Sequence, residues 1–261
     1  MTKIAIVGAS GRMGKSLVEA ISMDSSTTLA AAIDREDSQT IGRHVGSNHT
    51  VIVSSLLDVI DSVDVVIDFS SPSAAVRNSE ICSRLGKNIV IGTTGLTSEQ
   101  VNCIRSATKS TAICMSSNFA PGVNLCFKLA EMAASALGDD VEIEISEAHH
   151  KHKLDAPSGT ALTLGHMVAR ALDRDLDQVA VYQRQGDIDA RDSKAISFSS
   201  IRAGDIVGDH TVMFSGDGER VEITHKASSR MAFAKGAIRA AKWLSGQDSG
   251  LFDMQDVLGL K

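Results

Sequence analysis

The sequence predicts an α/β fold, with a doubly wound parallel sheet in its first half and an α+β region with a mixed sheet in its second half. In the first half, short uninterrupted apolar runs occur between helical patterns, which is typical of parallel strands covered on both faces. After residue 120, apolar and polar residues alternate within the predicted strands, as in a sheet with one exposed face. A chain of 261 residues can form one large domain or two smaller ones.

The elements of the first half follow from these runs. Within residues 12–21, Met13, Leu17, Val18 and Ile21 have helical spacing, which predicts an amphipathic helix. A second helix can begin at residues 71–72, where serine precedes proline. The predicted strands are residues 3–7, 29–33, 63–68, 88–91 and 111–115.

The second half begins with a long helix that Pro121 can open and that extends to about residue 137. We find no internal repeat and no low-complexity linker, so the boundary near residue 120 is a change of pattern without a flexible tether. The later predicted strands are residues 141–146, 196–202, 206–214 and 219–225, with helices over 158–172 and 230–244.

Composition excludes several classes of protein. A hydrophobic content of 43% and a charged content of 22% are those of an ordinary globular protein and exclude a mainly disordered one. A net charge of −6 and an aromatic content of 3% argue against nucleic-acid binding. The four cysteines form no C-x-x-C pair, so we expect reduced thiols and a cytoplasmic location. We expect no signal peptide and no membrane span, because the chain opens on a strand and no apolar run approaches about 20 residues.

A glycine-rich loop, GASGRMG at residues 8–14, lies between the first predicted strand and the first predicted helix. Glycines in such a loop let the backbone approach a pyrophosphate, and the helix N-terminus offers free N–H groups to the anion. A tight turn without a ligand is the alternative. The context favours a Rossmann-type dinucleotide-binding unit, whose predicted contacts in this loop are Gly8, Ala9, Ser10, Gly11, Arg12 and Met13.

Asp34 ends the second predicted strand, 20 residues after Gly14. An acidic residue at this place can accept hydrogen bonds from the ribose hydroxyls of the cofactor, which favours NADH. Arg12 and Arg35 flank the place of a 2′-phosphate, which favours NADPH. The mixture predicts that both cofactors are accepted, although each arginine could also be an ordinary surface charge.

Two further loops follow the fourth and fifth predicted strands. Ligands of open α/β sheets bind outside the carboxyl ends of the strands, so both loops could contact the nicotinamide. Either could instead be a simple polar connection. The predicted cofactor-binding residues here are Gly92, Thr93, Thr94, Ser116, Ser117, Asn118 and Phe119.

Residues 147–161, EAHHKHKLDAPSGTA, hold three of the eight histidines at the end of a predicted strand. Histidine can exchange protons near neutral pH, and lysine can protonate or stabilise a developing anion. The N–H groups of a helix beginning after Ser158, a typical N-cap residue, form a natural carboxylate site. A metal site is disfavoured because Lys151 and Lys153 would repel a cation, and an exposed basic loop is the remaining alternative.

These segments resemble the 4-hydroxy-tetrahydrodipicolinate reductase family, formerly called dihydrodipicolinate reductase, of the diaminopimelate route to lysine. The resemblance spans essentially the whole chain and includes the runs 8–14, 92–95, 147–161, 202–208 and 225–230. The block 147–161 is highly specific and shows no departure from the family. Asp34 stands where some members have glutamate, which leaves the cofactor preference open.

The resemblance implies a particular organisation. Residues 1–120 and 230–261 would form the dinucleotide-binding domain, and residues 121–229 the substrate-binding and oligomerisation domain. The protein would be a cytoplasmic homotetramer that uses NADH or NADPH and has no metal, nucleic-acid or membrane partner.

The resemblance also implies the reaction and the roles of five residues. The enzyme would reduce 4-hydroxy-tetrahydrodipicolinate to tetrahydrodipicolinate with hydride from the nicotinamide. His149 would be the acid/base, Lys153 the proton donor to the ring and His150 a substrate contact, while Gly159 and Thr160 would hold a substrate carboxylate. A cationic pocket of this kind in an acidic protein suits a dicarboxylate.

Two other functions remain open at this point. A nucleotide-sensing protein could keep the fold and lose the chemistry, but the intact His149 and Lys153 count against it. An oxidoreductase of the aspartate dehydrogenase type could share the scaffold, but the block 147–161 counts against it.

Overall fold

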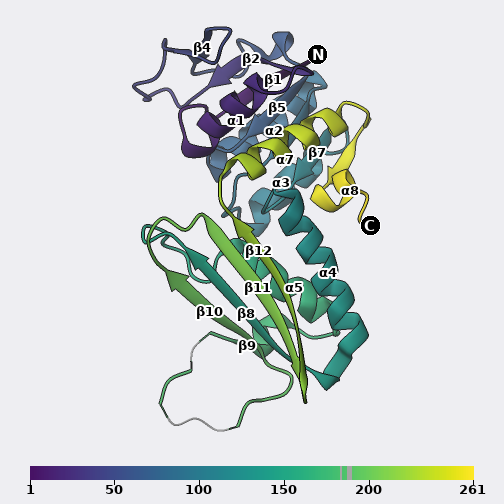
Figure 1. Ribbon diagram of the computed structural model, residues 1–261. Helices are drawn as coiled ribbons and strands as arrows, with labels where there is room; N and C mark the ends of the chain where they lie inside the picture. The colour runs from purple at the N-terminus through teal and green to yellow at the C-terminus, as the bar shows by residue number, and fades with distance from the viewer. Residues whose placement is uncertain (183, 187–189) are drawn as a thin grey trace. The chain divides into compact units, whose positions relative to one another are not determined.

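The structure is a computed structural model that describes residues 1–182, 184–186 and 190–261 (Figure 1). The chain forms two compact units, one of Met1–Pro121 with Arg230–Lys261 and the other of Gly122–Ser229. Across the described residues, no helix is long and apolar enough to span a bilayer.

The first unit is built on an eight-stranded sheet in the order β13-β7-β6-β5-β1-β2-β4-β3. All its neighbouring strands are parallel except β3 and β4. The predicted parallel sheet is therefore confirmed, and the unpredicted strands β3, β4 and β13 extend its edges. The strands are β1 (Thr2–Val7), β2 (Thr27–Ile33), β3 (His44–Val45), β4 (Thr50–Val53), β5 (Val65–Asp68), β6 (Asn88–Ile91), β7 (Ala112–Met115) and β13 (Gly250–Phe252).

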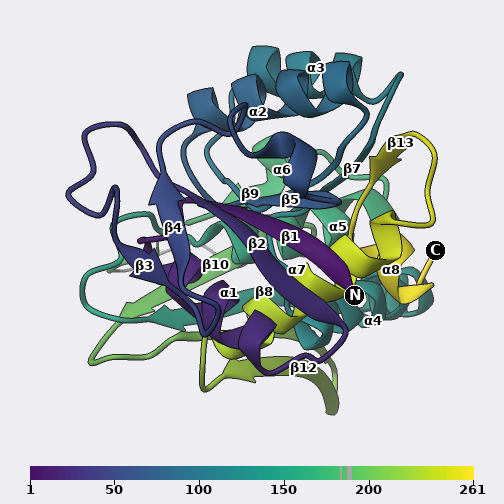
Figure 2. The same cartoon turned by 90° about the horizontal axis from the view of Figure 1, so that it is seen from above.

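Helices cover both faces of this sheet, as Figure 2 shows with α2 and α3 on one side and α1 and α7 on the other. Leu17 of α1 and Ile238 of α7 belong to the same buried apolar cluster, whereas Ile81 of α2 and Ile104 of α3 belong to the cluster on the opposite face. The helices of this unit are α1 (Arg12–Ser22), η1 (Ile60–Ser62), α2 (Pro72–Leu85), α3 (Ser98–Ala107), α7 (Met231–Leu244) and α8 (Met254–Leu258).

The second unit contains a five-stranded mixed sheet in the order β12-β11-β8-β10-β9. Strand β8 is parallel to β10 and antiparallel to β11, which confirms the predicted mixed sheet. The strands are β8 (Glu142–His149), β9 (Ala180–Val181), β10 (Ile196–Arg202), β11 (Gly208–Gly216) and β12 (Glu219–Ala227), and the helices are α4 (Pro121–Leu137), η2 (Gly138–Asp140), α5 (Gly159–Ala171) and α6 (Leu176–Val179).

Alternation along β8 determines which side chains face the interior of the second unit. Ile143, Ile145, Glu147 and His149 are buried, whereas the residues between them are half-buried. The buried face is therefore apolar at the start of the strand and carries a glutamate and a histidine at its end. Because β8 is a central strand and α5 begins ten residues after it ends, the functional segment is anchored at both ends.

Candidate functional site

The glycine loop joins β1 to α1 through a turn that requires glycine at its first position. Gly8 has a φ of +80°, and a Cβ there would lie 2.8 Å from the carbonyl oxygen of Phe69. Gly11 N–H donates to the carbonyl of Gly8 at 3.0 Å, which closes the turn. No described side chain caps the first turn of α1 after Gly11, so its backbone N–H groups are available to an anion.

Asp34, directly after β2, is tied to this loop. Its carboxylate accepts hydrogen bonds from the N–H of Ser10 at 3.2 Å and from the Ser10 hydroxyl. The Asp34 Oδ1 atom also accepts the N–H of Arg35 at 2.9 Å. Arg35 itself is 78% exposed and pairs with Asp37 at 3.1 Å. The structure thus brings Ser10 and Asp34 together, whereas the side chain of Arg35 is directed to Asp37.

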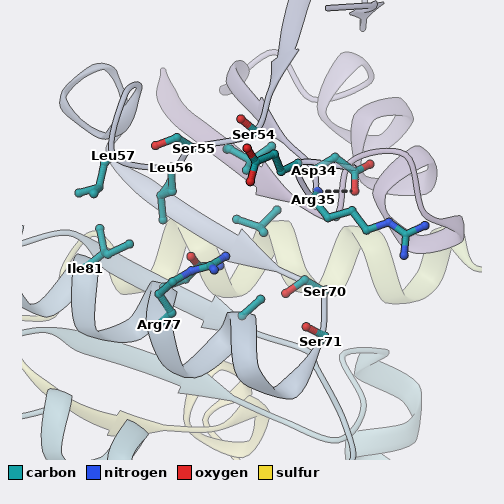
Figure 3. Close-up of a pocket in the computed structure, with 16 residues that line it drawn as sticks. Asp34, Arg35, Ser54, Ser55, Leu56, Leu57, Ser70, Ser71, Arg77 and Ile81 are labelled. Atoms are coloured by element: carbon teal, nitrogen blue, oxygen red, sulfur yellow. Dashed lines mark hydrogen bonds between the residues drawn. The ribbon is translucent and has the colours of Figure 1, made fainter. Parts of the chain in front are cut away.

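A cavity of about 530 Å³ lies beside Asp34 at the carboxyl ends of the central strands (Figure 3). In Figure 3 the apolar side chains of Leu56, Leu57 and Ile81 gather at one end, and Arg77 extends from α2 toward the middle. Of the predicted cofactor residues, Gly8, Asp34 and Arg35 line this cavity. Its other lining residues were not predicted: Val7, Ile33, Glu36, Ser54, Ser55, Leu56, Leu57, Ser70, Ser71, Ala74, Arg77, Asn78 and Ile81.

Thr93, in the loop after β6, belongs to a buried network around Asp68. The Asp68 carboxylate is fully buried at the end of β5 and accepts hydrogen bonds from Ser70 N–H at 2.9 Å, Asn78 Nδ2 at 2.7 Å and Thr93 Oγ1 at 3.1 Å. Burial raises the pKa of Asp68, against the opposing effect of these hydrogen bonds. The network fixes the loops after β5 and β6 against each other, and Ser70 and Asn78 reach the cavity from it.

The loop after β7 is held by its own hydrogen bonds. The Ser116 hydroxyl donates to the carbonyl of Asn118 at 2.8 Å, and the Asn118 side chain accepts the N–H of Ala120 at 2.9 Å. The Phe119 ring is 1% exposed and packs edge-on against Phe69, with ring centroids 5.6 Å apart. The side chain of Phe119 is therefore part of the core.

In the second unit, His149 ends β8 and is paired with Glu147. His149 Nδ1 lies 2.6 Å from Glu147 Oε2, and the Glu147 side chain is 1% exposed. Burial lowers the pKa of His149 from its usual value, while the hydrogen bond and charge of Glu147 oppose that shift. His149 is therefore neutral at pH 7 and can accept a proton at Nε2.

The Glu147 carboxylate has further donors. Arg202, at the end of β10, donates to both of its oxygens at 2.9 and 2.7 Å, and the N–H of Ser158 donates at 3.2 Å. Burial alone would raise the pKa of Glu147, but hydrogen bonds from Arg202, Ser200 and His149 lower it to about 2. The carboxylate is therefore charged throughout the neutral range.

Lys153 lies in the loop between β8 and α5, and its ammonium donates to Asp155 at 2.9 Å. The Lys153 side chain is 21% exposed, and its backbone N–H donates to the carbonyl of His150 at 3.1 Å. The backbone hydrogen bond closes a turn, so Lys153 lies close to His150 and His149 in the chain fold.

Helix α5 begins as the sequence predicted, with Ser158 as its N-cap. The Ser158 hydroxyl accepts the N–H of Ala161 at 3.2 Å, and it lies 2.9 Å from Nε2 of the buried His210 on β11. Thr160 is 8% exposed, and a Cβ at Gly159 would meet open space. The backbone at Gly159 is therefore accessible at the positive end of the helix dipole.

The sequence analysis gave no site role to three members of this site: Glu147 and Arg202, which lie in the runs 147–161 and 202–208, and His210. A period of two along β8 places Glu147 on the face of His149, so this signal was present in the sequence. Arg202 and His210 come from neighbouring strands, and their approach depends on sheet pairing. Within the described part of the chain, no group of three or more histidine, cysteine or acidic side chains is arranged to hold a metal ion.

Comparison with known families and structures gives one consistent result. The sequence model described as "Dihydrodipicolinate reductase, N-terminus" matches residues 2–119, and that described as "Dihydrodipicolinate reductase, C-terminus" matches residues 122–258. A dipicolinate-bound dihydrodipicolinate reductase from Paenisporosarcina sp. TG-14 is similar over 98% of both chains, with 25% identity and a TM-score of 0.79.

More distant structures share the fold alone. A probable dehydrogenase from Thermotoga maritima has 12% identity over 98% of this chain and 92% of its own, with a TM-score of 0.64. Aspartate dehydrogenase from the same organism has 15% identity over 95% of this chain and 98% of its own, with a TM-score of 0.53.

Proposed function

The chain belongs to the dihydrodipicolinate reductase family, and we propose that His149 and Lys153 perform the proton transfers of its reaction. The enzyme is an oxidoreductase that reduces 4-hydroxy-tetrahydrodipicolinate to tetrahydrodipicolinate in the diaminopimelate pathway of lysine biosynthesis. Its reductant is NADH or NADPH. Loss of water forms a ring double bond, and one hydride and one proton then saturate a double bond of the cyclic imine.

The first unit fits a nicotinamide dinucleotide. A Cβ at Gly8 would meet the Phe69 carbonyl, the N-terminus of α1 is open, and Asp34 stands beside the cavity. The loop of Gly8 and Gly11 would hold the pyrophosphate, and Asp34 the ribose hydroxyls. We assign residues 92–94 and 116–119 to the nicotinamide end. When bound, the cofactor supplies the hydride.

The second unit would hold the dicarboxylate substrate. At the N-terminus of α5 the backbone of Gly159 is accessible, and we assign the substrate carboxylate to hydrogen bonds from this backbone and from Thr160, which is 8% exposed. His150, next to His149, would contact the substrate, and the ammonium of Lys153 adds positive charge in the same segment. A cyclic dicarboxylate would accept hydrogen bonds at the start of α5 and could replace Asp155 as the partner of the Lys153 ammonium, which is 2.9 Å away in this structure.

The proton transfers follow from the protonation states of two side chains. Lys153 would give a proton to the ring carbon that becomes electron-rich on hydride addition. His149, neutral with Nδ1–H directed at Glu147, would exchange a proton with the substrate at Nε2. The observation that carries this assignment is the buried Glu147–His149 pair in the segment that also holds Lys153 and begins α5.

The test is a set of alanine variants with controls from the same loop. His149→Ala and Lys153→Ala should each lower kcat about 10²–10⁴-fold, the usual contribution of an acid–base group, and leave NADPH affinity unchanged. Lys151→Ala and His152→Ala remove the same side-chain types at exposed positions of the loop and should retain turnover. Near-normal turnover in both His149→Ala and Lys153→Ala would refute the assignment.

We further propose that the enzyme accepts both cofactors. Asp34 suits the ribose hydroxyls of NADH, whereas Arg35 and Arg12, both exposed, would offer guanidinium groups to a 2′-phosphate. Isothermal titration of the protein with NADH and NADPH would test this, and a failure to bind either one would contradict it.

We also propose a cytoplasmic homotetramer in which the unit Gly122–Ser229 binds substrate and carries the subunit interface. The family resemblance supports this proposal, and apolar side chains on the strands of this unit are exposed, with Ile201 at 54% and Val221 at 42%. Light scattering coupled to size-exclusion chromatography would measure the oligomer, and a monomer at micromolar concentration would contradict the proposal.

A further inference from the structure

A single buried carboxylate connects the separate parts of the second unit's site. Glu147 accepts hydrogen bonds from His149 Nδ1 at 2.6 Å, from two nitrogens of Arg202 at 2.9 and 2.7 Å, and from the N–H of Ser158 at 3.2 Å. These donors belong to the end of β8, the end of β10 and the N-cap of α5. Glu147 therefore links the proposed acid/base to the proposed carboxylate site.

The contact with His149 determines which ring nitrogen carries the proton. An ionised carboxylate can accept hydrogen bonds but cannot donate them, so neutral His149 must be protonated at Nδ1. Its Nε2 atom then carries a lone pair that can accept a proton. A Cβ added at Gly208 would lie 3.0 Å from Nε2, so the glycine at this position leaves space beside that atom.

Arg202 extends the network to the loop that holds Lys153. Besides Glu147, its guanidinium donates to the carbonyl of Asp155 at 2.6 Å, and the Asp155 side chain accepts the ammonium of Lys153 at 2.9 Å. The side chain of Arg202 is 19% exposed and that of Glu147 is 1% exposed, so the pair is shielded from water. The Glu147–Arg202 ion pair therefore also contacts the backbone of the loop that carries Lys153.

The other charged or titratable groups facing His149 do not replace Glu147. His210, on β11, stacks edge-on at a centroid distance of 5.1 Å, and burial lowers its pKa to about 3, so it is neutral. Lys153 and Arg202 are cationic and disfavour protonation of His149. Glu147 is the partner that both orients the ring and compensates the surrounding positive charge.

We propose that Glu147, paired with Arg202, is a positioning residue that holds His149 with Nε2 unprotonated and fixes the start of α5 for the substrate carboxylate. This inference rests on the proposed function, because it assigns Glu147 an effect that acts through His149 and α5. It predicts that charge at Glu147, rather than its volume, governs both proton transfer and dicarboxylate affinity.

The test is Glu147→Gln in the full protein, with Glu144→Gln as the matched control. Glu144 lies on the same strand and also pairs with arginines, but it occupies the other face of β8. In Glu147→Gln, kcat should fall about tenfold or more without exceeding the loss in His149→Ala. The inhibition constant of pyridine-2,6-dicarboxylate should rise, and NADPH affinity should not change.

Histidine NMR provides a readout that a loss of folding would not produce. Because Glu147 raises the pKa of His149, the pKa should fall further in Glu147→Gln, and the ring should lose its preference for Nδ1–H. Glu144→Gln should leave the His149 titration unchanged. In a double-mutant cycle, Glu147→Gln should cost little additional kcat once His149 is alanine, since its effect passes through that ring.

The outcomes separate this inference from the proposed function. If His149→Ala retains normal turnover, the acid/base assignment fails. If His149→Ala is inactive while Glu147→Gln has normal kcat and an unchanged His149 titration, the positioning role fails and the assignment stands. Should Glu147→Gln not fold, Arg202→Lys keeps the charge but loses the bidentate contact. That variant should lower kcat and dicarboxylate affinity together, and unchanged values would overturn the proposal.

Discussion

Replacing Gly14 with alanine should displace the backbone of the glycine-rich loop and lower the stability of the protein. A Cβ at Gly14 would lie 2.2 Å from the carbonyl oxygen of Gly8, 2.5 Å from that of Ala9 and 2.6 Å from the carbonyl carbon of Ala9, so it overlaps three backbone atoms. Backbone cannot rotate away as a side chain can, so the cost should lie near the top of the usual range of about 1–3 kcal/mol for overpacking. Alanine regains about 1 kcal/mol of helix propensity, which leaves a net loss of about 2 kcal/mol.

Gly11 offers a control within the same loop. A Cβ at Gly11 would lie 3.2 Å from the Gly8 carbonyl, and its φ of −67° is accessible to any residue. We therefore expect Gly11→Ala to fold normally and to weaken NADPH binding, because its methyl group occupies the approach of the pyrophosphate.

Thermal melting and calorimetric titration distinguish these effects. At about 2–4 °C per kcal/mol for a chain of this size, Gly14→Ala should lower the Tm by about 4–8 °C. Displacement of the loop should also weaken NADPH binding by about 10- to 100-fold, since a lost charged hydrogen bond costs about 1.5–3 kcal/mol. A Gly14→Ala protein with the parent's Tm and NADPH affinity would refute the packing argument, and unaltered binding in Gly11→Ala would refute the pyrophosphate position.

Three further expectations follow from single side chains. Arg35→Ala should weaken NADPH more than NADH, by about 1.5–3 kcal/mol in titration, and equal losses would show that it does not contact the 2′-phosphate. Thr160→Val keeps the side-chain shape and removes the hydroxyl, so the substrate KM and the inhibition constant of pyridine-2,6-dicarboxylate should rise while NADPH affinity stays the same. An unchanged inhibition constant would show that the carboxylate does not bind at Thr160. The depressed pKa of His210, about 3 when folded against 6.5 as reference, means that the unfolded state binds more protons between these values. Stability should therefore fall as the pH drops below about 6.5, by about 2 kcal/mol at pH 5 in urea unfolding, and His210→Gln should flatten that slope.

The parallel sheet of the first unit could be predicted because its central strands are continuous apolar runs. The strand predicted at residues 88–91 matches β6. Strands β3 and β13 were missed because elements of two and three residues carry no usable periodicity. The strand predicted from residue 63 begins at Val65 in the structure. Residues 60–62 form a 3-10 turn, and Val63, which follows this turn, is buried but lies outside the strand.

The candidate site was only partly predictable for a different reason. The chemistry-bearing residues His149 and Lys153 lie within one short segment, so the sequence itself displays them together. Arg202 is 53 residues after His149, and it arrives opposite His149 through the parallel pairing of β8 and β10. Spacing along the chain cannot reveal such a partner, because it depends on which strands become neighbours.

The residues that line the cavity of the first unit were only partly predictable for the same reason. Leu56 and Leu57 come after β4, an element that the sequence pattern did not reveal, and Arg77 lies on the helix predicted only by its start. The glycine loop and Asp34 could be found because their spacing is fixed by one β-α-β unit.

The most direct test of the account is the consumption of NAD(P)H by the purified protein. Freshly formed 4-hydroxy-tetrahydrodipicolinate should cause a loss of nicotinamide absorbance in the parent protein, and pyridine-2,6-dicarboxylate should inhibit it. The loss should be greatly slowed in His149→Ala and Lys153→Ala. No loss above the buffer rate with the parent protein, with either cofactor, would contradict the account.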